Sequence, residues 1–115
     1  MNLNDYQKQA ITTELMKRSD KLNANDPALV AKILGLVGEA GETADKFKKV
    51  IRDKEGIISD DTKVEIAKEL GDVLWYISAL SDYLGYTLED IAELNLKKLY
   101  DRRDRGTQRG SGDNR

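Results

Sequence analysis

The chain has 115 residues, a formal net charge of −2, and neither cysteine nor histidine. This length suits one domain with a modest core. The missing residues exclude disulfides, thiolate metal sites, cysteine nucleophiles and imidazole as a general base or zinc ligand. Any catalysis must therefore use carboxylates, lysine, arginine, tyrosine or a bound metal. With no apolar run of membrane-spanning length and no signal-peptide pattern, we expect a cytoplasmic protein without a membrane partner.

The first predicted helix runs from Leu3 to about Ser19, with Asn4 or Asp5 as its N-cap. After a polar loop, Asp26-Pro27 combines an N-cap with a proline at N1, a strong helix start.

The second predicted helix covers residues 28–52, with apolar residues on one arc. Glycines 35, 38 and 41 recur within it, and each costs about 1 kcal/mol relative to alanine. Close approach of a backbone or a ligand would explain them, and a local kink is the alternative.

A third helix is predicted over residues 62–84, capped by Ser59-Asp60-Asp61 and closed by Gly85. The capping-box sequence 87–90 opens a fourth helix over residues 88–103. Asn95 falls within the inner apolar stripe of this helix, where a buried amide needs a hydrogen-bond partner.

Four helices joined by short connections predict an all-α, four-helix bundle-like domain over residues 1–105. Apolar residues also lie outside the inner arcs, which predicts a second packing surface and hence a homodimer or homotetramer. Residues 106–115 contain no apolar side chain, so composition predicts a flexible Gly/Arg-rich tail. The alternative is a tail whose Gly110-Ser111-Gly112 backbone closes over an anion.

Two pairs of acids, Glu39/Glu42 and Glu69/Asp72, have i, i+3 spacing and therefore share a face of their helices. Glu39 and Glu69 border the apolar arcs, where a fully solvated face would not place them. Four converging carboxylates need a cation, and oxygen-only ligands suit Mg²⁺, with Mn²⁺ as the alternative. A solvated acidic face is the competing interpretation, because acids three residues apart also arise by chance in a chain that is 35% charged.

Cations near such a cluster would indicate phosphate chemistry. Lys46 and Lys49 follow Glu42 along the same edge of the second helix, and Asn95, Lys98 and Arg102 share a face of the fourth. Each lysine taken singly is also compatible with an ordinary surface charge.

The combination of Glu39-x-x-Glu42, Glu69-x-x-Asp72 and Asn95-x-x-Lys98-Leu99-x-x-Arg102 resembles the MazG-type all-α nucleoside triphosphate pyrophosphohydrolases. The strings Gly-Glu-Ala-Gly-Glu and Lys-Glu-Leu-Gly-Asp-Val-Leu-Trp-Tyr and the opening Tyr6-Gln7-x-x-Ala10 are also similar to this family. The similarity covers residues 3–105.

This resemblance implies Mg²⁺-dependent hydrolysis of a nucleoside triphosphate to a monophosphate and pyrophosphate, by attack of water on the α-phosphorus. The implied metal ligands and catalytic residues are Glu39, Glu42, Glu69 and Asp72, with Glu42 orienting or deprotonating the water. The implied phosphate contacts are Asn95, Lys98 and Arg102, assisted by Lys46 or Lys49. Candidates for the nucleobase pocket are Trp75, Tyr76 and the Tyr6–Gln7 region, with core packing as the alternative role.

Three other interpretations remain open. The chain could be a base-specific dUTP or dCTP pyrophosphatase or a relative of phosphoribosyl-ATP pyrophosphohydrolase, because the four acids do not distinguish these enzymes. It could be a non-catalytic helical module that binds a protein partner. A nucleic-acid binder is disfavoured, because the C-terminal arginines lack interleaved aromatic residues and the overall balance is acidic.

Overall fold

The computed structural model describes residues 1–115 and contains four helices and no strand. They are α1 (Leu3–Ile11), α2 (Pro27–Asp53), α3 (Asp60–Tyr83) and α4 (Leu88–Asp104). The all-α prediction is confirmed. None of the helices combines the length and apolarity that crossing a membrane requires.

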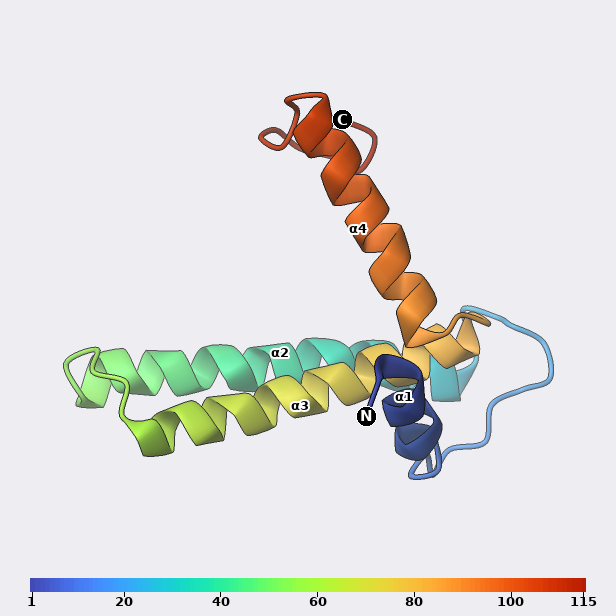
Figure 1. Ribbon diagram of the computed structural model, residues 1–115. Coiled ribbons are helices and arrows are strands. Elements are labelled where there is room, and N and C mark those ends of the chain that lie inside the picture. Colours follow the sequence, from blue (N-terminus) through green and yellow to red (C-terminus); the bar gives the residue numbers. More distant parts are fainter.

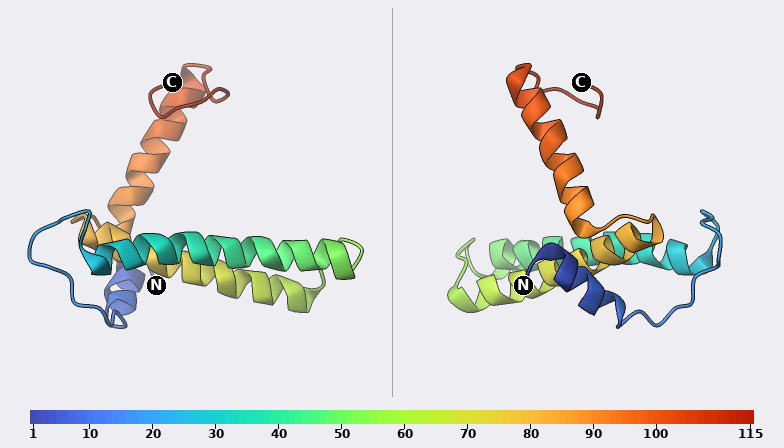
Figure 2. Two further views of the ribbon diagram at one scale, coloured as in Figure 1. Left: turned by 180° about the vertical axis from the view of Figure 1, so that it is seen from behind. Right: turned by 45° about the vertical axis from the view of Figure 1, so that its right-hand side comes forward.

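Helices α2 and α3 form a long antiparallel pair, and α1 lies against α3 near its C-terminal end (Figure 1). Helix α4 packs on α1 and α3 only at its start and then projects away from the pair in every view (Figure 2). The long face of α4 is therefore not covered by the α2–α3 pair in the single chain.

Local capping signals define most helix ends as predicted. The Asp26 side chain accepts a hydrogen bond from the Ala28 N–H, with Pro27 at the first helical position. Ser59 caps α3, and Thr87 and Asp90 form a reciprocal capping box on α4. Gly85 has a positive φ of 79°, and it ends α3 with the paired backbone bonds of a Schellman motif.

The predicted extent of the first helix is wrong, because α1 ends at Ile11 and its N-cap is Asn2. The Thr12 and Thr13 hydroxyls donate to the carbonyls of Gln9 and Ala10, each at 2.6 Å, where the helix stops. Beyond them, the Glu14 carboxylate pairs with Lys32 Nζ of α2 at 2.9 Å. This tertiary ion pair holds residue 14 away from a continued helical path.

Gln7 fixes α1 to the junction between α3 and α4. Its Nε2 donates to the carbonyl oxygens of Ser78 at 3.2 Å and Tyr86 at 3.1 Å, and its Oε1 accepts from the Leu88 N–H at 3.0 Å. The side chain is buried, and both ends of its amide have partners. Gln7 is therefore a structural residue that helps to set the direction of α4.

The core of the single chain is small. The apolar arc predicted for the second helix includes Phe47 and Ile51, which are 42% and 72% exposed in α2. Leu34 and Val37 on the same helix are each 67% exposed. Much of the apolar surface of the α2–α3 pair is thus available for another packing partner.

Candidate functional site

The two predicted acid pairs lie on neighbouring antiparallel helices. Carboxylate oxygens of Glu39 on α2 and of Glu69 and Asp72 on α3 all lie within 4.8 Å of one another. Glu39 and Glu69 are half-buried, whereas Asp72 is exposed. Glu42 is exposed and lies outside this group of three. We call Glu39, Glu69 and Asp72 the acid cluster.

The electrostatics of the cluster indicate a site that favours a cation. Burial raises the pKa of Glu39, and the negative charges of Asp72, Glu69 and Glu42 raise it further, in that order. Glu42 therefore contributes to the field at Glu39 although it is not one of the three converging carboxylates. A divalent cation would relieve this repulsion, and oxygen ligands of this type suit Mg²⁺.

The two predicted lysines of α2 have different surroundings. Lys46 Nζ lies 3.5 Å from Glu69 Oε1 and 3.8 Å from Glu65 Oε2, so it is adjacent to the acid cluster. Lys49 Nζ instead pairs with Asp45 at 2.7 Å. Hydrogen bonds from Lys48 and Lys49 lower the pKa of Asp45 to about 2. The structure thus brings Lys46, and not Lys49, to the acid cluster.

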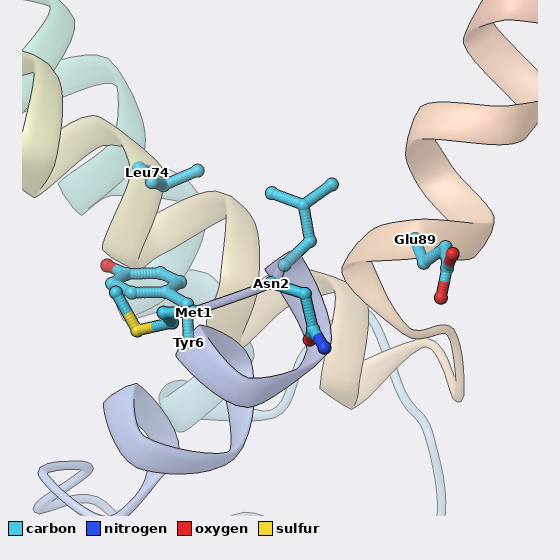
Figure 3. A pocket seen from close by; sticks show the side chains of 6 residues that line it. Met1, Asn2, Tyr6, Leu74 and Glu89 are labelled. Atoms are coloured by element: carbon cyan, nitrogen blue, oxygen red, sulfur yellow. The ribbon is translucent and has the colours of Figure 1, made fainter.

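A cavity of about 550 Å³ opens beside α1 and has mostly apolar walls. Figure 3 shows Met1 and Tyr6 side by side, with Leu74 facing them and Glu89 across on α4. Burial raises the pKa of Tyr6, and the nearby charge of Asp72 raises it further. Tyr6 therefore lines the cavity and lies within electrostatic range of Asp72, one member of the acid cluster.

Sequence reasoning identifies Tyr6 as a pocket candidate but misses Met1 and Leu74. The apolar periodicity of its helix assigns Leu74 to core packing, so the sequence does not mark it as a cavity residue. Nothing in the local sequence of Met1 indicates that the N-terminus returns to α3.

Trp75 and Tyr76 take part in packing. The indole Nε1 of Trp75 donates to the Ala10 carbonyl at 3.1 Å and to Thr13 Oγ1 at 2.8 Å. The Tyr76 ring meets Trp75 edge-on and lies so close to Gly35 that a Cβ there would overlap it. The neighbour of Gly35 is thus a side chain and not the predicted backbone or ligand, and a Cβ added at Gly38 or Gly41 would meet nothing within 4 Å.

The three residues of α4 that are predicted to contact phosphate, Asn95, Lys98 and Arg102, do not lie at the acid cluster within one chain. Asn95 is exposed, so the expectation of a buried amide is wrong. The prediction placed Asn95 in the inner apolar stripe because it took α4 to pack lengthwise on the other helices, whereas α4 projects away from them (Figure 1). Lys98 and Arg102 instead contact Asp113 of the C-terminal segment, at 3.0 Å and 3.3 Å.

Comparison with known proteins adds to this geometry. The family model described as MazG nucleotide pyrophosphohydrolase domain matches residues 29–107. Over 82 residues the chain is 50% identical to the Gene 37 protein of Mycobacterium phage L5, covering 71% of this chain and 72% of that protein. No solved structure matches the chain. The family match includes the acid cluster, Lys98 and Arg102, but neither Tyr6 nor Asp113.

Proposed function

The chain belongs to the family of MazG nucleotide pyrophosphohydrolase domains, and from this premise we propose that it hydrolyses a nucleoside triphosphate to a monophosphate and pyrophosphate. The observation that carries the proposal is the convergence of Glu39, Glu69 and Asp72 from two helices within 4.8 Å. Three carboxylates at this separation repel one another, and a bound cation would offset that repulsion.

We propose Mg²⁺, with Mn²⁺ as an alternative, as the ion held by Glu39, Glu69 and Asp72, with Glu42 completing the acidic set. The donor chemistry fits, because carboxylates are hard oxygen ligands, and burial followed by the charges of Asp72, Glu69 and Glu42 raises the pKa of Glu39. When bound, such an ion neutralises phosphate oxygens and lowers the pKa of a coordinated water.

Glu42 is the proposed general base. It is exposed, and it lies outside the three converging carboxylates, so its oxygens are free to accept a proton from a water molecule. That water forms a new bond to the α-phosphorus while the bond from this phosphorus to the bridging oxygen of pyrophosphate breaks. Lys46, which lies beside Glu69, is the residue that we propose to hold negative charge on the phosphates.

The cavity lined by Met1, Tyr6 and Leu74 is the proposed position of the nucleoside. Its walls are mostly apolar, which suits a nucleobase, and the charge of Asp72 acts on Tyr6, which lines it. Trp75 and Tyr76 support the neighbouring part of α3 by packing on α1 and on Gly35.

We further propose a homodimer or homotetramer in which α4 of one subunit approaches the acid cluster of another. Within one chain Asn95, Lys98 and Arg102 are remote from the acids, and Leu34 and Val37 leave apolar surface uncovered. Sedimentation velocity tests this arrangement. Val37→Glu is expected to dissociate the oligomer, whereas Leu15→Glu provides a control at an apolar position outside the α2–α3 pair, 97% exposed.

The test of the activity is a panel of ribo- and deoxyribonucleoside triphosphates incubated with Mg²⁺, with pyrophosphate and orthophosphate measured separately. Release of pyrophosphate supports the proposal. Glu39→Gln and Glu69→Gln are expected to abolish turnover, while Glu93→Gln, an exposed acid on α4 without an ion pair, retains it. Turnover that survives both cluster substitutions would overturn the site assignment.

The same panel, extended to phosphoribosyl-ATP, separates a broad pyrophosphohydrolase from a dUTP- or dCTP-specific one. Release of no product from any of these substrates would instead favour a non-catalytic helical module.

A further inference from the structure

The C-terminal segment, residues 106–115, returns to the last turns of α4 (Figure 1). Arg102 Nη2 donates to the carbonyl oxygens of Gly112 at 3.1 Å and Asp113 at 3.0 Å. Arg115 in turn donates to the carbonyls of Gly112 at 2.6 Å and Gln108 at 3.2 Å. Composition predicts no packing for this segment, whereas arginine side chains organise it through its backbone carbonyls.

The side chain of Asp113 lies at the centre of these contacts. Its Oδ1 is 3.0 Å from Lys98 Nζ and 3.3 Å from Arg102 Nη2. Lys98 and Arg102 lie four residues apart, on one face of α4, and converge on the same carboxylate oxygen. They therefore form an anion site that the chain fills with its own carboxylate.

This site has donor capacity that Asp113 does not use. The Arg102 side chain is only 7% exposed, and its Nε is buried without a hydrogen-bond partner. A guanidinium group presents five N–H donors in a planar fork that suits the oxygens of a phosphate. Asp113 Oδ1 and the carbonyl oxygens of Gly112 and Asp113 all contact the same nitrogen, Nη2, so a larger anion that also engaged the other guanidinium nitrogens would match the fork more completely.

We propose that Asp113 is a built-in competitor, which occupies the Lys98–Arg102 anion site in the free chain and is displaced when the polyphosphate group of a ligand binds there. The identification of that polyphosphate with a nucleoside triphosphate rests on the proposed function. The displacement itself requires only that Lys98 and Arg102 bind phosphate oxygens.

The contact of Asp113 has the properties of a displaceable occupant. Its side chain is 82% exposed, and exposed ion pairs stabilise weakly. It contributes a single negative charge, whereas a polyphosphate contributes several charges and several acceptor oxygens. The hydrogen bond and charge of Lys98, followed by those of Arg102, lower the pKa of Asp113, so the occupant is a carboxylate anion at neutral pH.

Binding of inorganic tripolyphosphate, measured by calorimetry on the full chain without metal, tests the proposal. Asp113→Asn is expected to tighten binding by about three- to tenfold, because the ligand no longer competes with the docked carboxylate. Asp104→Asn is the matched control, since it removes the same charge from another exposed acid paired with an arginine. Its effect should stay below about twofold. Lys98→Gln should weaken tripolyphosphate binding both in the parent chain and in the Asp113→Asn variant.

A second measurement follows the tail directly. Because the chain has no cysteine, Ser111→Cys provides a unique position for a fluorophore. Tripolyphosphate is expected to lower its fluorescence anisotropy, with half-saturation at the calorimetric dissociation constant.

Three results would overturn the proposal: absence of tripolyphosphate binding, an Asp113→Asn variant that binds no more tightly than the parent, or a rise in anisotropy, which would mean that the tail closes over the anion. The outcome is independent of the proposed activity. The Glu69→Gln variant should lose turnover, but tripolyphosphate should still displace Asp113 from Lys98 and Arg102 in it.

Discussion

The ring of Tyr76 on α3 lies directly against the α-carbon of Gly35 on α2, in space that a Cβ would occupy. This contact lets the two helices approach next to the acid cluster. Gly35→Ala is expected to lower the free energy of unfolding by about 1–3 kcal/mol through overpacking. Urea denaturation measures the change.

Gly71→Ala is the control for this substitution, because Gly71 lies within α3 and a Cβ added there would meet no neighbour within 4 Å. It is expected to stabilise the protein by up to about 1 kcal/mol through helix propensity. Equal stability of the two variants would mean that Tyr76 does not require the glycine.

Metal binding should be visible in the thermal stability of the protein. If Glu39, Glu69 and Asp72 bind Mg²⁺, the midpoint of unfolding should rise with metal concentration, by about 2.7 kcal/mol in free energy at 100 times the dissociation constant. Glu39→Gln should remove this dependence, and Glu93→Gln should keep it. An unchanged midpoint in the parent chain at millimolar Mg²⁺ would contradict the metal site.

Because Lys32 and Glu14 form a largely buried ion pair, we expect the effects of substituting them on the free energy of unfolding to be strongly coupled. Lys32 is only 4% exposed, and its Nζ also lies 5.7 Å from the centroid of the Trp75 ring. Glu14→Gln leaves the lysine charge buried and unpaired, so we expect a loss of about 3 kcal/mol in unfolding free energy. Adding Lys32→Met should recover much of that loss. Additive losses in urea denaturation would show that the pair is not coupled.

The sequence was informative where structure depends on neighbouring residues. Asp26-Pro27, Ser59 and the Thr87–Asp90 box define helix starts locally, so those boundaries could be predicted. The meeting of Glu39 with Glu69 and Asp72 could also be predicted, because a short loop forces α2 and α3 to run antiparallel.

The errors arose where distant contacts decide the outcome. The end of α1 depends on the pairing of Glu14 with Lys32, and the direction of α4 depends in part on the three hydrogen bonds of Gln7. The exposure of Asn95 follows from that direction. The docking of the tail depends on donation from Arg102 to backbone carbonyls and on the contacts of Asp113 with Lys98 and Arg102, which composition does not reveal.

The pH dependence of tail docking follows from Asp113. Its contacts with Lys98 and Arg102 lower its pKa below the ordinary value of 3.8, so Asp113 is deprotonated at neutral pH whether or not the tail is docked. The stabilisation is fully present above 3.8 and is lost as pH falls through the lowered pKa, because protonation removes the anion. A fluorophore at position 111 should therefore report a docked tail from neutral pH down to about pH 5 and release only below the ordinary pKa.

Asp113→Asn separates this local event from general acid unfolding. The variant should show a more mobile label already at neutral pH and no further release between the ordinary and the lowered pKa, while circular dichroism follows the helices in both proteins. If both proteins released the label over the same acidic range, the carboxylate of Asp113 would not be the group that holds the segment on α4, and the arginine–carbonyl bonds alone would account for docking.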